Sequence, residues 1–176
     1  MNDQIAIVLK SYPLFEKDMV VELFTKEMGR LNAFVKYAQS NKPRFGGLLQ
    51  SINKVKVSLK STNNNHYLTQ VSLVNSYSKL KTSFIKINKC YTLLNIVRSM
   101  TQLNQENEAL YDVVSLGIDQ LDISDIDDVS SIGLNVLRSI IQCEGIGNSL
   151  EIEKYSEKEL LNMIESYTHI PIKESS

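Results

Sequence analysis

The sequence has few of the residues on which most active sites and metal centres depend. Among its 176 residues there are two histidines, His66 and His169, two cysteines, Cys90 and Cys143, and no tryptophan. The two cysteines imply no disulfide framework, and their spacing from the histidines matches no usual zinc site. No glycine-rich phosphate motif ends in Lys-Ser or Lys-Thr, and no histidine accompanies a recognisable nucleophile. We therefore expect a protein that is not an enzyme and holds no cofactor or metal.

Long apolar runs are also missing. A membrane-spanning helix needs about 20 consecutive apolar residues, and no run in the chain approaches that length. The first residues, MNDQIAIVLKSY, carry an acid where a signal peptide carries its positive charge, and their apolar run is short. These features predict a cytoplasmic protein.

The most informative absence is that of acidic residues in one long stretch. The net charge is −1, yet residues 1–90 contain 14 Lys or Arg against 5 Asp or Glu, and residues 91–176 contain 5 against 15. Between Glu27 and Glu106 there is no acid, whereas 12 basic residues occur there. This asymmetry indicates a polyanionic partner for the first half. The alternative is that the two halves attract each other, within one molecule or between copies.

Five segments in the first 77 residues have β character. Residues 30–38 alternate cleanly, with Leu31, Ala33 and Val35 on one face, and Gly29 before them suits a hairpin turn. The segments are residues 4–10, which Pro13 is expected to stop, 18–25, 30–38, 48–60 with a possible bulge near Asn53, and 66–76. Five short strands with turn-rich joints predict a small closed barrel.

After Tyr77 the apolar period changes to that of a helix. Spacings of three and four residues predict a first helix over about 79–102, with Leu80, Phe84, Ile87, Tyr91, Leu94 and Val97 inward. Further helices are predicted over 106–121, from Ser124, with Ile126 buried, to about Gly145, and after the capping box of Ser156 and Glu159. The fold class is therefore α+β, with a five-stranded barrel over residues 1–77 and a helical domain over 78–176.

An acidic run, DISDIDD at residues 122–128, precedes the third predicted helix. It lacks the spaced ligands and the central glycine of a calcium loop. Because acids at a helix N-terminus stabilise the helix dipole, we interpret the run as a helix start rather than as a cation site.

Basic and aromatic residues interleave along the predicted barrel. Single-stranded nucleic acids are held in this way, since cations follow the phosphates and exposed rings stack on bases. The candidate DNA-binding residues are Arg30, Phe34, Lys36, Lys42, Arg44, Phe45, Lys54, Lys56 and Lys60. Phe34 and Phe45 have an alternative role as packing residues. The loop QSNKPRFGGL, residues 39–48, has two glycines that would let its backbone approach a nucleic-acid strand closely.

Residues 11–52, SYPLFEKDMVVELFTKEMGRLNAFVKYAQSNKPRFGGLLQSI, resemble the N-terminal signature of the RecO family of recombination mediators. The matching positions are Tyr12, Glu16, Asp18, Leu23, Phe24, Thr25, Gly29, Arg30, Leu31, Lys36 and Arg44 through Gln50. Tyr37 stands where that family commonly has glycine, and Ser51 stands where it often has proline. The late helical region lacks the four-cysteine zinc element of many relatives, so the chain resembles a short member of the family.

The resemblance implies an oligonucleotide-binding (OB-fold) barrel followed by a helical domain. It implies a non-enzymatic mediator of DNA repair and recombination that binds single- and double-stranded DNA and anneals complementary strands. The implied partners are a RecR-like protein and the acidic C-terminal tail of the single-strand binding protein. Arg98 and Arg138 are candidates for contacting that tail, although salt bridges are their alternative role. Another reading of the whole chain is a protein-interaction adaptor whose basic barrel docks an acidic protein.

Overall fold

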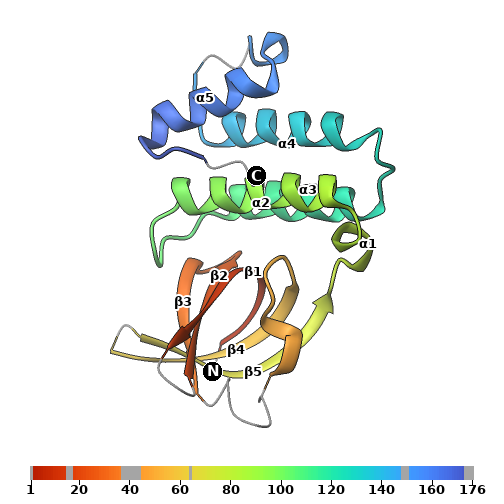
Figure 1. Cartoon of the computed structure of the whole chain (residues 1–176). Helices are drawn as coiled ribbons and strands as arrows, with labels where there is room; N and C mark the ends of the chain where they lie inside the picture. Colours follow the sequence, from red (N-terminus) through yellow and green to blue (C-terminus); the bar gives the residue numbers. More distant parts are fainter. Residues whose placement is uncertain (1, 15–17, 37–44, 64, 148–150, 173–176) are drawn as a thin grey trace. The chain divides into compact units, whose positions relative to one another are not determined.

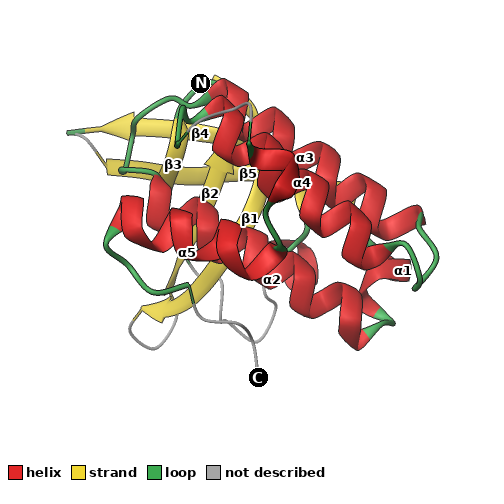
Figure 2. Cartoon of the chain, turned by 90° about the horizontal axis from the view of Figure 1, so that it is seen from above, coloured by secondary structure: helices red, strands yellow, loops and turns green. Residues whose placement is uncertain are grey.

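The computed structural model describes residues 2–14, 18–36, 45–63, 65–147 and 151–172. The chain forms two compact units. One unit comprises residues 1–77 together with 102–108, and the other comprises residues 78–101 and 109–176. Figure 2 distinguishes the strands of the first unit from the helices of the second.

The first unit is a closed barrel of five strands, with neighbours in the order β1-β2-β3-β5-β4. The strands are β1 (Asn2–Leu14), β2 (Asp18–Thr25), β3 (Gly29–Val35), β4 (Lys54–Thr62) and β5 (Asn65–Asn75), coloured red to yellow in Figure 1. All neighbouring pairs are antiparallel except β3 and β5, which run parallel. A short 3₁₀ helix, η1 (Gly46–Leu49), precedes β4.

The barrel closes over an apolar core to which every strand contributes. Alternation sends Leu31, Ala33 and Val35 of β3 inward, as predicted, where they meet Leu23 of β2 and Val57 of β4. Each of these side chains is fully buried, and burial of a Val or Leu contributes roughly 1.5–3 kcal/mol. The other barrel strands add further apolar side chains to the same cluster.

The first strand is longer than predicted, because Pro13 does not end it. Pro13 pairs with Met19 of β2, whereas the pairing of β1 with β4 covers only Asn2 to Ile7. Among the described residues, this part of β1 is paired in a ladder with β2 alone. Proline is tolerated at such an edge because no ladder there needs its missing N–H.

The irregularity predicted near Asn53 is present, as a turn at Ile52 and a register shift of β4 against β5 at Lys54/Val55. Ile52 lies before β4 with a positive φ of 78°, and its N–H donates to the Val8 carbonyl at 2.8 Å. The turn reverses the direction of its side chain, so Ile52 is buried although alternation along β4 would place it outside. The register shifts of β4 against β5 fall at Lys54/Val55 and Ser58/Leu59.

The second unit contains the helices. They are α1 (Ser78–Lys81), α2 (Phe84–Met100), α3 (Glu108–Ile123), α4 (Val129–Cys143), the 3₁₀ helix η2 (Ile152–Lys154) and α5 (Glu157–Thr168). The first residue of α3, Glu108, belongs to the barrel unit. Helix α4 packs against both α2 and α5. The capping box predicted for α5 is confirmed, since Glu159 accepts hydrogen bonds from the Ser156 N–H and hydroxyl.

Two predictions about the helices were wrong in detail. The segment predicted as the first helix forms two helices, α1 and α2. The Ser83 side chain caps α2 by accepting a hydrogen bond from the Lys86 N–H, and Phe84 is therefore exposed at the start of α2. The third starts at Val129 instead of Ser124, so Ile126 lies in a turn and is exposed. Periodicity alone does not place a helix start, because the cap decides it.

Candidate nucleic-acid interface

The outer face of β3 carries one part of the candidate site. Arg30, Asn32 and Phe34 alternate with the buried residues of this strand and face outward, and Lys36 follows the strand on the same alternation. Because alternate residues of a strand share a face, the local sequence pattern is sufficient to bring Phe34 and Lys36 to one surface.

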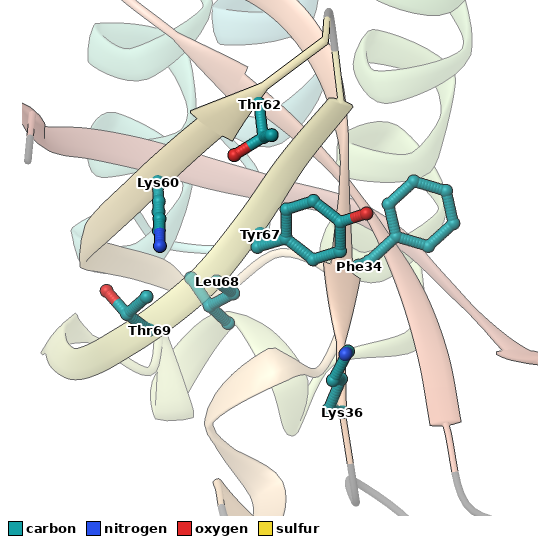
Figure 3. Close-up of a pocket in the computed structure, with 7 residues that line it drawn as sticks. All are labelled: Phe34, Lys36, Lys60, Thr62, Tyr67, Leu68 and Thr69. Atoms are coloured by element: carbon teal, nitrogen blue, oxygen red, sulfur yellow. The ribbon is translucent and has the colours of Figure 1, made fainter.

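Two further strands extend this surface. Phe34 of β3 is paired with Tyr67 of β5, and Tyr67 is paired with Lys60 of β4. Residues directly opposite each other in neighbouring strands point to the same side of a sheet, and the following residue of β5, Leu68, is buried in the core. Phe34, Tyr67 and Lys60 therefore form one transverse row on the outside of the barrel, with Tyr67 at its centre (Figure 3).

The aromatic rings and the lysines of this surface are close together. The ring centroids of Phe34 and Tyr67 are 5.6 Å apart with their planes inclined by 33°. The Lys36 Nζ lies 5.9 Å from the centroid of the Tyr67 ring, within the range of a cation–π interaction. With Lys60, Thr62 and Thr69 these residues line an open hollow of about 400 Å³, and none of the described residues that line it is a carboxylate. We call this the ring–lysine hollow.

Two of the predicted cations have carboxylate partners within the barrel. The Arg30 Nη1 lies 2.8 Å from the Glu22 Oε1, and Glu22 is almost fully buried and also accepts from the Tyr12 hydroxyl. The Lys56 Nζ lies 3.1 Å from the Asp3 Oδ2, in an exposed pair. The Ser58 hydroxyl and then Lys56 donate to Asp3, and these hydrogen bonds, with the charge of Lys56, lower the pKa of that carboxyl. The positive charge of Arg30 and Lys56 is therefore partly offset.

The remaining predicted residues lie elsewhere or outside the described part of the chain. Lys54 is half-buried at the start of β4. Phe45 packs against the barrel core, the arrangement expected of a packing residue. Lys42 and Arg44 lie outside the described residues, so their part in the site stays a prediction.

Tyr67 is the member of the hollow that the sequence reasoning missed. Its position next to the inward Leu68 in the segment HYLTQV marks it as outward, and that alternation was an available signal. Its closeness to Phe34 was not available, because the parallel pairing of β3 with β5 joins residues that are 33 positions apart.

A second hollow of about 730 Å³ lies at the turn between β4 and β5, and shares Thr62 with the first. Its lining includes Glu27, Glu106 and His66. The His66 Nδ1 lies 2.9 Å from the Ser61 hydroxyl, and the His66 Nε2 lies 2.9 Å from the Asn104 Oδ1. Its carboxylates make this end of the barrel unfavourable for a polyanion. They thus mark one end of the favourable surface.

In the helical unit, Arg138 makes a salt bridge with Glu153 at 3.2 Å, the alternative role that was expected for it. Within the described residues, no group of three or more His, Cys, Asp or Glu side chains has an arrangement that would hold a metal ion. Over the same residues, no helix combines the length and the apolar character needed to cross a membrane.

A closed five-stranded barrel followed by helices places the chain in the class of OB-fold proteins with a helical unit, as predicted from the sequence. The family model described as "Recombination protein O N terminal" matches residues 1–77, which include all five strands. The predicted resemblance to the RecO family is thereby confirmed, and over residues 1–77 it takes in the whole barrel.

Curated relatives agree with this assignment. The chain is 26% identical over 135 residues to the DNA repair protein RecO of Thermoanaerobacter sp. (strain X514), an alignment that covers 75% of this chain and 54% of the relative. It is 42% identical over 52 residues to that of Koribacter versatilis, covering 30% of this chain and 21% of the relative. With that of Pelodictyon phaeoclathratiforme it shares 24% identity over 163 residues, covering 92% of this chain and 62% of the relative. The alignments thus span between 21% and 62% of the length of these relatives.

Proposed function

We propose that the chain acts in DNA repair as a non-enzymatic mediator that binds single-stranded DNA through the outer face of its barrel. The observation that supports this most directly is the ring–lysine hollow. Its described lining combines aromatic rings with lysines and includes no acid, which suits bases and phosphates together. The relatives, which are named as DNA repair proteins, point in the same direction. In this proposal residues 1–77 are the nucleic-acid-binding domain and residues 78–176 the helical domain.

Annealing of complementary strands is part of the proposal and needs no bond chemistry. Lysines that neutralise the phosphates of two strands lower the repulsion between those strands. Lys36 and Lys60 are exposed and belong to the hollow. Lys42 and Arg44, which precede η1 in the sequence, are proposed to add phosphate contacts. We further propose that a RecR-like protein and the tail of the single-strand binding protein are partners.

The test is fluorescence anisotropy with a labelled single strand at several salt concentrations. If about five phosphates are neutralised, the logarithm of the affinity falls with the logarithm of the salt concentration with a slope of about −3 to −4. Lys36→Ala and Lys60→Ala should each reduce the magnitude of that slope by about 0.7. Lys154→Ala, which removes an exposed lysine of the helical unit, is the matched control and should leave the slope unchanged.

A salt-independent affinity would overturn the proposal. The adaptor alternative is separated by competition. An acidic peptide that displaces the oligonucleotide at equal or lower concentration would favour a protein partner for the barrel. Displacement only by unlabelled oligonucleotide would support the proposed function.

A further inference from the structure

The ring–lysine hollow lies where two strands separate. The parallel pairing of β3 with β5 consists of Ala33 with His66 and Phe34 with Tyr67. Beyond this point β3 ends at Val35, whereas β5 continues to Asn75 along β4. The rings of Phe34 and Tyr67 line the hollow, and Lys36 and Lys60 lie on opposite sides of Tyr67 (Figure 3).

The ring of Tyr67 has the surroundings of a stacking platform. It is half-buried, held against Phe34 on one flank and approached by the Lys36 ammonium. The chain continues from it into the buried Leu68 and into Thr69, whose hydroxyl donates to the Ser58 carbonyl at 2.8 Å. A ring held in this way loses little conformational freedom when a planar ligand stacks on it.

The chemistry of the lining selects the ligand. Flat apolar faces suit a planar heterocycle, and two lysines beside them suit anionic groups on either side of it, a combination found in a nucleotide within a strand. Few polar groups line the hollow, so it has few hydrogen-bonding groups with which to distinguish one base from another. In a duplex each base is stacked between its neighbours and paired, and a protein ring reaches it only if it leaves the stack.

Building on the proposed function, we propose that the hollow seats one unpaired nucleobase stacked on Tyr67, with Lys36 and Lys60 beside the adjoining phosphates. Tyr67 is then the residue by which the barrel distinguishes single strands from duplex DNA. Phosphate contacts by lysine alone do not provide that distinction, because both forms carry phosphates.

The experiment compares three labelled probes of equal length by anisotropy: an oligothymidylate, an abasic strand that retains the sugar-phosphate backbone, and a blunt duplex. The unaltered protein should bind the oligothymidylate at least about 5-fold more tightly than the abasic strand, since stacking contributes about 1–3 kcal/mol per base. Equal affinity for these two probes would refute the stacked base without the use of any variant.

Variants then assign the effect to Tyr67. Tyr67→Leu keeps an apolar side chain but removes the ring, and should weaken oligothymidylate binding about 5- to 100-fold while leaving abasic and duplex binding unchanged. Tyr67→Phe restores the ring and should restore the preference for bases. Tyr167→Leu, at an exposed tyrosine of α5, is the matched control and should leave the binding of all three probes unchanged.

The outcomes separate this inference from the proposed function. If no probe binds in a salt-dependent manner, the proposed function itself fails. If all probes bind and Lys36→Ala weakens them, but Tyr67→Leu has no effect or weakens the three equally, the DNA-binding function stands and the base-seating role of Tyr67 is refuted.

Discussion

Gly29 provides a sharp test of how the barrel holds the segment 102–108. This glycine has a positive φ of 64°, and a Cβ placed on it would lie 1.8 Å from the carbonyl oxygen of Gln105. Beside it, the Asn104 N–H donates to the Arg30 carbonyl at 2.7 Å, and Arg30 and Leu103 form an isolated parallel bridge. A side chain at position 29 therefore displaces residues 104–105 from the barrel, because a backbone atom cannot remain at such a distance.

The expected cost follows from two contributions. A non-glycine residue in the left-handed region costs about 1–2 kcal/mol, and loss of the Asn104 hydrogen bond adds about 0.5–1.5 kcal/mol. Gly29→Ala should therefore lower the free energy of unfolding by about 1.5–3.5 kcal/mol. For a chain of this length that corresponds to a fall in Tm of about 3–14 °C.

Gly145→Ala is the matched control. Gly145 has nearly the same φ, 67°, but a Cβ there would meet no atom within 4 Å. Gly145→Ala should lower the free energy of unfolding only by the cost of the left-handed conformation, about 1–2 kcal/mol. The assays are thermal unfolding and amide hydrogen exchange of a peptide covering residues 102–108, where exchange should accelerate in Gly29→Ala alone. Equal destabilisation by the two substitutions, with unchanged exchange at Asn104, would refute the close approach.

Two further predictions concern charged groups. Glu22→Gln removes the buried negative charge that faces Arg30 and should lower the free energy of unfolding by about 1–3 kcal/mol. Glu108→Gln, which breaks the exposed pair with Lys26, should lower it by less than about 1 kcal/mol. Chemical denaturation of both variants checks this, and equal costs would contradict it. Hydrogen bonds from the Ser156 hydroxyl and N–H lower the pKa of Glu159 from its usual 4.5, so its contribution is present above about pH 4.5 and is lost as the pH falls through the lowered value. The difference in Tm between the unaltered protein and Glu159→Gln should accordingly shrink between pH 5 and pH 3, and a constant difference would speak against this cap.

Much of the fold could be predicted because its signals are local. Strand alternation placed Leu31, Ala33 and Val35 inside and Phe34 outside, and the capping box placed the start of α5. The break between α1 and α2 was missed, because the hydroxyl of a single serine, Ser83, creates it within an otherwise regular apolar period. Pro13 was misjudged because its effect depends on which neighbours its strand has at that position.

The candidate site, too, has features that the sequence predicted and features that only the tertiary structure decided. Composition and spacing were enough to indicate a basic, ring-bearing barrel and to identify Phe34, Lys36 and Lys60 as its candidates. Only the tertiary structure showed that Arg30 is paired with Glu22 and Lys56 with Asp3, and that Tyr67 lies against Phe34. Charges and periods belong to the chain itself and can be read along it. Which side chain meets which depends on strand pairing between distant segments, and that pairing is decided when the whole barrel closes around its core.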